Sequence, residues 1–192
     1  NNKRPLATED ITRLLNYKSD CPFKQHAVDF WKLSYYWMGI NLRDVIKLQW
    51  SNVHDDKIYY YRSKTFKRSK VKRKNTVFLD DRTTVVIDKY RGTGSFIFNV
   101  LEDSMSEEQK YKTGKNFIRK INQHLKKVAV ELDISTDISS IWSRHSFATE
   151  MKKKKVSPYI IQEAFGHKDI KTTENYMSSL VEDDLRNIQR SL

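Results

Sequence analysis

The sequence is poor in the residues on which several protein classes depend. Among its 192 residues Cys21 is the only cysteine, which excludes a disulfide framework within the chain and argues against a structural zinc site. Only five residues are glycine, and Gly92-Thr93-Gly94 lacks the third glycine and the following helix of a phosphate cradle. No apolar run approaches the ~18 residues that span a bilayer, and the polar first 20 residues are not a signal peptide.

Positive charge, by contrast, is abundant and unevenly placed. The chain has 36 Lys and Arg against 24 Asp and Glu, a formal net charge of +12. Three stretches, 62–74, 110–127 and 152–155, are basic and contain no acidic residue. With 38% hydrophobic and 12% aromatic residues the chain can fold around a core, so it is not simply a disordered basic tail.

These basic stretches favour a polyanionic partner, nucleic acid above all, although a solvated surface of a Lys-rich chain remains the alternative. A membrane-surface role is disfavoured, because no basic stretch is paired with an exposed apolar helix face. The candidate DNA-binding residues are Arg62, Lys67, Arg68, Lys70, Lys115 and Arg119.

Apolar spacing and capping residues predict a mainly α protein with a small antiparallel β-sheet, an α+β fold without internal repeats. One helix is expected to begin at Thr8, and a second at Pro22 with Phe23 on its apolar face. Three more are expected to follow caps: an Asn41 cap, an Asp80-Asp81 cap (helix 82–91) and a capping box at 104–107. The remaining expected helices span residues 115–132, 140–153, 158–166 and 172–177. Residues 57–62 and 76–79 are expected to pair as strands around a basic hairpin, and residues 96–98 to form a short buried segment.

The sequence contains no motif that indicates metal-dependent or serine-hydrolase chemistry. None of the five histidines pairs with another at i,i+4, and no carboxylate cluster accompanies them. No nucleophile elbow is present either. The expected complement of cofactors and metals is therefore none.

Two C-terminal motifs carry a family resemblance. Residues 143–149 read Ser-Arg-His-Ser-Phe-Ala-Thr, and residues 164–176 read Ala-Phe-Gly-His-Lys-Asp-Ile-Lys-Thr-Thr-Glu-Asn-Tyr. Together they closely resemble the signature of tyrosine recombinases, the phage-integrase family: an Arg-His-Ser/Thr-Phe-Ala helix, then Leu-Gly-His, eight residues and a Tyr. Phe165 stands where Leu is usual. Residues 4–10, 39–50 and 62–65 extend the resemblance over most of the chain.

The resemblance implies roles for individual residues. Tyr176 would attack a DNA phosphodiester, giving a 3′-phosphotyrosine and a free 5′-hydroxyl, without ATP or metal. The guanidinium of Arg144 would match the charged non-bridging oxygens, and His167 would donate a hydrogen bond to the phosphate. Lys64 would protonate the leaving oxygen, with Lys67 as its substitute if the hairpin register shifts.

The sequence departs from the family pattern at two positions. Asn41 occupies the place of the family's first arginine, and Ile141 stands three residues before Arg144, where a polar residue such as His is frequent. Arg43, two residues along, would replace the arginine only if the helix started differently. His145 is expected to support the site rather than react. Integrases of Bacteroides-type mobile elements, which this chain resembles, also vary at the first arginine.

The function implied is that of a site-specific recombinase that integrates or excises a mobile element in the bacterial cytoplasm, at the nucleoid. Residues 1–176 would form the catalytic domain, and 177–192 a tail that packs on a neighbouring protomer or folds back in cis. The family's N-terminal DNA-binding domain is expected to be missing from this chain, which agrees with the absence of a starting Met. The partners would be double-stranded DNA and three further copies, the isolated chain being monomeric. The alternatives are a catalytically impaired DNA-binding protein of this fold and a type IB topoisomerase.

Overall fold

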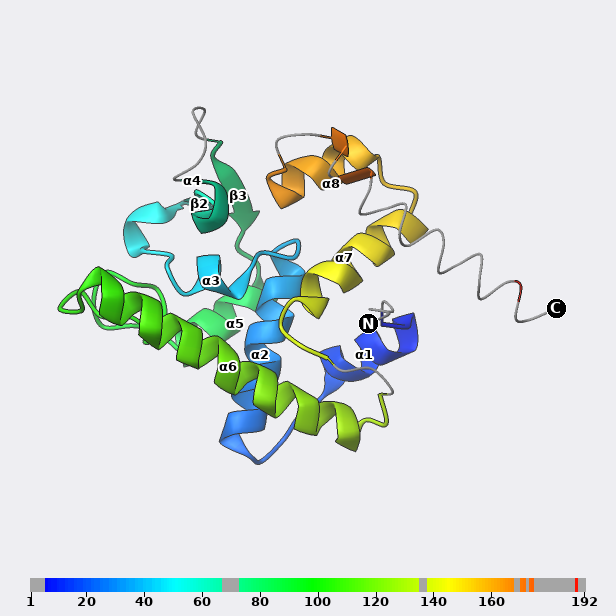
Figure 1. The fold of residues 1–192 in the computed structure, drawn as a ribbon, viewed down its shortest axis with the longest axis horizontal. Helices are drawn as coiled ribbons and strands as arrows, with labels where there is room; N and C mark the ends of the chain where they lie inside the picture. Colours follow the sequence, from blue (N-terminus) through cyan, green and yellow to red (C-terminus); the bar gives the residue numbers. More distant parts are fainter. Residues whose placement is uncertain are drawn as a thin grey trace.

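The computed structural model describes residues 6–66, 73–134, 138–167, 170–171, 173–174 and 189. The described part is mostly helical with one three-stranded sheet, as predicted (Figure 1). Its elements are α1 (Thr8–Asn16), α2 (Pro22–Tyr36), α3 (Leu42–Val45), η1 (Trp50–Asn52), β1 (Val53–His54), β2 (Lys57–Tyr60), α4 (Ser63–Phe66), β3 (Asn75–Phe78), α5 (Asp81–Lys89), α6 (Glu107–Glu131), α7 (Trp142–Lys153) and α8 (Pro158–Phe165).

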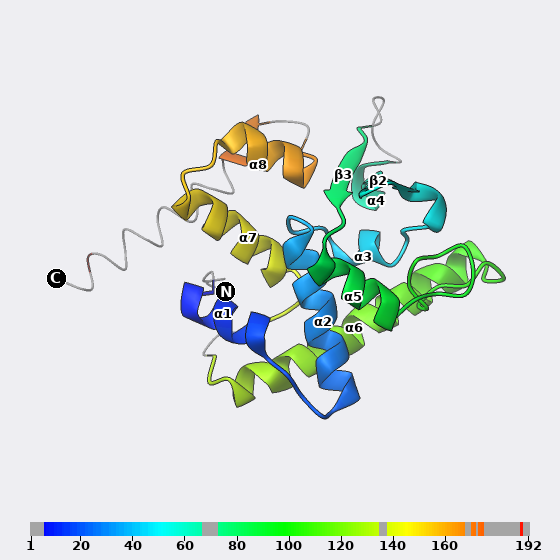
Figure 2. The same ribbon diagram turned by 180° about the vertical axis from the view of Figure 1, so that it is seen from behind.

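Helix α2 forms the centre of the core. It contacts α6, α7, α5 and α1, and Figures 1 and 2 show it between them from both sides. Phe30 and Trp31 are fully buried on it. Phe23 was predicted to share this apolar face, but its side chain is 66% exposed and stacks on the His124 ring. It lies in the first turn of α2, at the margin of the core.

The predicted hairpin is present, with modified ends. Strands β2 and β3 are antiparallel, with Lys57 opposite Phe78 and Tyr60 opposite Asn75. The first strand ends at Tyr60 rather than at Arg62, because the chain turns into α4, whose Phe66 N–H donates to the Arg62 carbonyl. The short strand β1, paired with β2, was not predicted.

Helix α6 is one continuous helix where the sequence predicted separate segments. Its capping box joins Ser106 and Gln109, two residues later than the predicted one. Gly114, which suggests a break, lies inside the helix and is buried. A Cβ there would lie 2.7 Å from Ile46 Cδ1, so the glycine allows α6 to approach α3 closely.

The remaining C-terminal helices follow the prediction closely. Helix α7 starts at Trp142, two residues later than expected. Ser157 caps α8, Pro158 opens it, and Gly166 ends it in the left-handed conformation with φ of 58°. Most of the predicted helix at 172–177 and the tail at 177–192 lie outside the described residues, save residue 189. Among the described helices, none combines the length and hydropathy needed to cross a bilayer.

Candidate active site

Arg144, in the first turn of α7, connects three segments. Its side chain is 7% exposed. Nη1 donates to the Gly39 carbonyl at 2.9 Å, and Nη2 donates to the Phe165 carbonyl at 3.0 Å. The same Nη2 lies 3.2 Å from His167 Nε2, and the guanidinium carbon lies 3.7 Å above the Phe165 ring. Main-chain carbonyls at the end of α8 and in the turn after α2 therefore hold the Arg144 guanidinium.

Gly39 is required for this arrangement. Its φ is 73°, a conformation that L side chains rarely adopt. A Cβ at this position would lie 2.8 Å from the Arg144 Cα. The glycine therefore lets the turn after α2 reach the backbone of α7 and offer its carbonyl to Arg144.

The ring of His167 is held between Arg144 and Thr173. A guanidinium only donates, so Nε2 accepts from Arg144 and the ring proton lies on Nδ1, which donates to Thr173 Oγ1 at 2.9 Å. Burial, followed by the positive charges of Arg144, Arg62 and Lys64, lowers the pKa of His167 to about 4. At neutral pH His167 is therefore uncharged.

This lowered pKa predicts a pH-dependent stability. An unfolded His takes up a proton near pH 6.5, whereas folded His167 does so near pH 4. Between these values only the unfolded state is protonated, so the free energy of unfolding falls as the pH drops from 6.5 to 4. Because the ring is only half-buried, we expect a loss on the order of 1 kcal/mol, discounted for solvent screening.

Urea unfolding at pH 7.5 and pH 5 measures this loss. The His167→Gln variant should lose less stability than the wild type by the amount stated. His26 and His124, whose pKa values burial also lowers, are present in both proteins and cancel in the difference. Equal losses in both proteins would contradict the assignment.

Arg62 and Arg73, at the base of the hairpin, donate hydrogen bonds to the turn that carries His167. Arg62, which the sequence assigns to DNA contact, donates from Nη1 to the Phe165 carbonyl at 3.0 Å. Arg73 donates to the His167 carbonyl at 3.0 Å and forms an ion pair with Glu163. Sequence reasoning did not single out Arg73, and no local signal marks it, because its partners lie 90 residues or more away.

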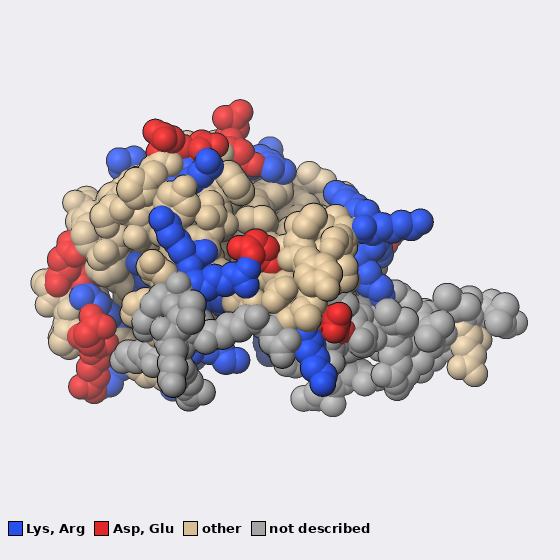
Figure 3. Space-filling view, turned by 90° about the horizontal axis from the view of Figure 1, so that it is seen from above, with Lys and Arg blue, Asp and Glu red and all other residues tan. Residues whose placement is uncertain are grey.

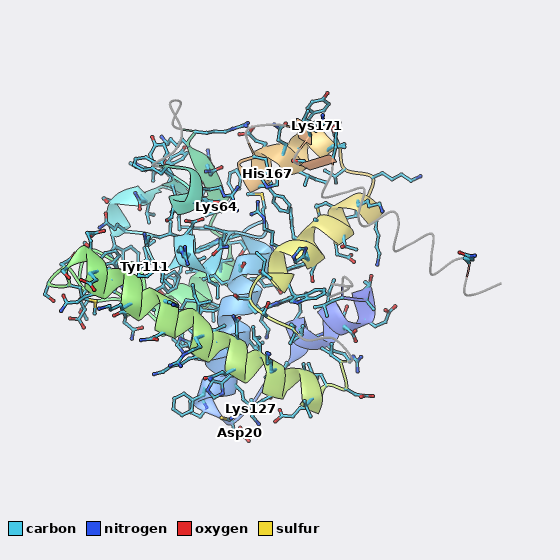
Figure 4. The ribbon with its side chains drawn as sticks, viewed as in Figure 1. Asp20, Lys64, Tyr111, Lys127, His167 and Lys171 are labelled. Atoms are coloured by element: carbon cyan, nitrogen blue, oxygen red, sulfur yellow. The ribbon has the colours of Figure 1, made fainter. Side chains whose placement is uncertain are left out.

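A cavity of about 330 Å³ opens beside these residues. Its lining combines three cationic side chains with neutral ones and one carboxylate: Asn41, Arg43, Asp44, Arg62, Lys64, Ile118 and Ser140. Lys64 extends from α4, and its positive charge is close enough to His167 to help lower the pKa of that ring. Figure 4 shows both residues where the hairpin, α7 and α8 meet. Such a cavity is suited to an anionic group such as a phosphate.

The structure gives different places to Asn41 and Arg43. Asn41 is the N-cap of α3, as predicted, and its Oδ1 accepts from the Arg43 N–H at 2.9 Å. Arg43 lines the cavity with Lys64, and its guanidinium lies 5.9 Å from the Tyr111 ring centroid. Arg43 therefore reaches the cavity from a helix that starts where it was predicted to start.

Asp44 is a cavity residue that sequence reasoning missed. It is 6% exposed, and its Oδ1 accepts from the Ser63 N–H at 2.8 Å, which fixes the start of α4 against α3. One signal was available: an acid among buried apolar neighbours such as Val45 and Ile46 is unusual unless it is hydrogen-bonded.

Two further candidates lie at the start of α7. Ile141 precedes the helix, and its carbonyl accepts from the Arg144 N–H at 3.1 Å. Its side chain is half-buried against the core and has no group that exchanges a proton. His145 is half-buried, with its ring 5.6 Å from the Trp142 indole.

The predicted DNA-binding residues are described only in part. Lys115 and Arg119 are exposed on α6, beside the cavity residue Ile118. Figure 3, which views the face formed by the hairpin and α8, shows Lys and Arg side chains in the middle and at one edge of this face, with acidic side chains between them. Tyr176, Lys67, Arg68 and Lys70 lie outside the described residues. Within the described ranges no three His, Cys, Asp or Glu side chains are grouped as metal ligands.

The comparison with known sequences agrees with the motifs. A sequence model of the phage integrase family matches residues 5–182. The tyrosine recombinase XerA of Saccharolobus solfataricus is 37% identical over 112 residues. This match covers 58% of the chain and 33% of the relative, so the chain matches about a third of that protein's length.

Solved structures share the fold at low sequence identity. The chain resembles XerA recombinase with a TM-score of 0.59 at 16% identity, over 96% of this chain and 65% of that one. For the Tn1549 transposon integrase in complex with transposon right end DNA, the TM-score is 0.66 at 13% identity, over 98% and 67%. For the catalytic domain of bacteriophage HP1 integrase it is 0.54 at 19% identity, over 92% and 88%.

Proposed function

Because the chain belongs to the phage integrase family, we propose that it is a site-specific recombinase that cleaves and rejoins DNA through a 3′-phosphotyrosine. The observation that carries this proposal is the buried Arg144, fixed against His167 beside a cavity lined by Lys64, Arg62 and Arg43. A preorganised guanidinium with further cations around it is what a phosphodiester needs as it gains charge in the transition state.

The proposed reaction uses only groups of this chain. The Tyr176 oxygen gives up its phenolic proton to solvent and bonds to phosphorus as the bond from phosphorus to the 5′-oxygen breaks. Arg144 stabilises charge on the non-bridging oxygens, and Lys64 gives the leaving oxygen its proton. The phosphotyrosine retains the energy of the broken ester, so the reverse attack by a 5′-hydroxyl rejoins the strand without a cofactor.

Arg43 is proposed to supply the second guanidinium, because it lines the cavity while the Asn41 oxygen caps α3. We expect Arg43→Ala to slow adduct formation on a nicked duplex by about 100-fold or more, in the range seen when one transition-state donor is removed. Asn41→Arg should then lower the rate, since it removes the cap and crowds the cavity.

The opposite pattern would assign the role to Asn41. If Asn41→Arg held or raised the rate and Arg43→Ala had little effect, Arg43 would not be the substitute. Lys47→Ala, on the residue that follows the C-cap of α3 and outside the cavity lining, is the matched control for loss of a nearby cation.

The biological setting is part of the proposal. The departure at the first arginine, shared with integrases of Bacteroides-type mobile elements, supports a role in integrating or excising such an element. Four protomers would act on two duplexes in the bacterial cytoplasm, with residues 177–192 contacting a neighbour. A separate N-terminal DNA-binding domain would belong to the complete protein.

Covalent trapping tests the proposed activity. The protein is incubated with a pool of duplexes of random sequence, each nicked near its centre, and DNA that stays attached in detergent is sequenced. Cleavage leaves a stable covalent adduct, because the short fragment beyond the nick diffuses away before religation. A site-specific recombinase traps only a defined subset of the sequences in the pool. Tyr176→Phe should trap none. Binding without trapping would indicate an impaired DNA-binding protein, and trapping without sequence preference a type IB topoisomerase.

DNA affinity should depend steeply on salt. If the three basic stretches make about six to ten phosphate contacts, affinity should fall by about 10³- to 10⁵-fold between 50 and 200 mM salt. Fluorescence anisotropy with a labelled duplex measures the slope. Lys115→Gln should lower the slope of log affinity against log salt concentration by about one. A slope near zero for the wild type would exclude these stretches as the DNA-binding surface.

A further inference from the structure

Thr173 is a fully buried residue whose hydroxyl contacts the candidate active site. Its Oγ1 lies 2.9 Å from His167 Nδ1, and its side chain has no exposed surface. Sequence reasoning assigned it no role. Thr173 nevertheless contacts Nδ1 of the His167 ring, whereas Arg144 contacts Nε2.

The main chain of His167 is already fixed without Thr173. Its N–H donates to the Gln162 carbonyl at 3.1 Å, and its own carbonyl accepts from Arg73 and from Gln162 Nε2. What these bonds leave undetermined is the rotation of the ring and the nitrogen that carries its proton. Both depend on the partners of Nδ1 and Nε2.

The two ring nitrogens have different requirements in the two states of the site. Facing the Arg144 guanidinium, Nε2 must accept and Nδ1 must carry the proton. Facing a phosphate oxygen, which only accepts, Nε2 must instead carry the proton. A threonine hydroxyl suits both states because it accepts as well as donates.

We propose that Thr173 is a positioning residue that holds the His167 ring through this exchange of tautomers. The hydroxyl accepts from Nδ1–H when Nε2 faces Arg144, and donates to Nδ1 when Nε2–H turns to the DNA phosphate. One proton leaves Nδ1 for solvent and one joins Nε2 from solvent, so the ring stays neutral. The second of these states rests on the proposed function.

The charges around the ring support a neutral exchange. Arg144 on α7, Arg62 and Arg73 at the base of the hairpin and Lys64 on α4 are cationic, while Glu163 on α8 is paired with Arg73. A positive charge on the His167 ring would be repelled by these cationic groups. A change of tautomer avoids that repulsion and still gives the phosphate a donor.

Nitrogen NMR of the His167 ring tests the positioning directly. Long-range correlation spectra of ¹⁵N-histidine protein at pH 7 identify the protonated nitrogen. Without anion, wild type and Thr173→Ser should carry the proton on Nδ1, and with saturating inorganic phosphate on Nε2. Thr173→Val should show a mixture of tautomers that phosphate shifts less. Thr149→Val, on a buried threonine of α7 that bonds the His145 carbonyl, should match the wild type.

A double-mutant cycle on a nicked duplex selected by trapping tests the catalytic consequence. Thr173→Val should slow adduct formation by about 10- to 100-fold, the range found when a hydrogen-bond partner that orients a metal-ligating histidine is lost. Thr173→Ser should restore most of the rate. With His167→Gln in place, Thr173→Val should have no further effect, because the threonine acts only through the ring.

Each outcome decides the assignment. A Thr173→Val protein with wild-type tautomers in both spectra would overturn it, and so would a loss that adds fully to that of His167→Gln. A wild-type chain that traps no DNA would contradict the proposed function instead. In that case the spectra with inorganic phosphate still decide whether Thr173 positions the ring.

Discussion

Arg144→Ala is expected to reduce covalent adduct formation on a nicked duplex by about a thousandfold or more, the upper range for loss of one transition-state donor. The reason is geometric. The guanidinium is buried and held by the Gly39 and Phe165 carbonyls, so it can meet developing charge without reorganising. Alanine leaves no group in its place. Arg144→Lys retains a charge but loses the planar fork, so we expect only partial recovery.

The same variant also weakens the fold, and the experiment must separate the two effects. Removing Arg144 leaves two carbonyls without this donor, at about 1–3 kcal/mol for each that stays unsatisfied. Leu125→Ala is a matched control, because Leu125 is fully buried in the core and its truncation costs about 2–5 kcal/mol. Both variants are assayed well below their unfolding temperatures, with Tyr176→Phe as the blank.

The comparison has a clear reading. Leu125→Ala should form adduct at nearly the wild-type rate, while folded Arg144→Ala should not. Adduct formation by folded Arg144→Ala at the wild-type rate would remove the basis of the whole assignment. Equal losses in both variants would attribute the effect to stability.

Lys64→Ala should slow cleavage of an ordinary phosphodiester by about 100-fold or more, within the range that general acid catalysis contributes. A substrate with sulfur at the 5′-bridging position has a leaving group that needs little protonation. On that substrate Lys64→Ala should cleave at close to the wild-type rate. The chemical reason is that the lysine supplies a proton that only the oxygen requires.

The control is Lys67→Ala, which tests the alternative hairpin register. If Lys64 is the acid, Lys67→Ala should weaken DNA binding without showing recovery on the sulfur substrate. Recovery in Lys67→Ala and none in Lys64→Ala would move the role to Lys67. Failure of sulfur to rescue either variant would show that neither lysine is the acid.

Local sequence determined several of the helix ends. The Ser157 cap, Pro158 and the left-handed Gly166 define α8 from both ends, and Asn41 caps α3 as predicted. The spacing of the motifs around Arg144 and His167 indicated the family to which the chain belongs. These features were readable because each depends on residues only a few positions apart.

Other features depended on contacts that no local pattern records. Gly114 suggests a break in α6, but the helix continues because the missing Cβ lets it pack against Ile46. Phe23 has the spacing of a core residue and lies outside the core, since burial depends on what the opposite element provides. In both cases tertiary packing overrode the local preference.

The chemistry divides in the same way. The sequence by itself determined which residue types are available: an arginine, a histidine, a hairpin lysine and basic stretches around them. Only the tertiary structure decided that Arg144 bonds the Gly39 carbonyl 105 residues away, that Arg73 holds the His167 carbonyl from 94 residues away, and that Arg43 lines the cavity. The physical reason is that the charge and tautomer of a buried group depend on partners brought close by folding, and these follow from packing rather than from sequence spacing.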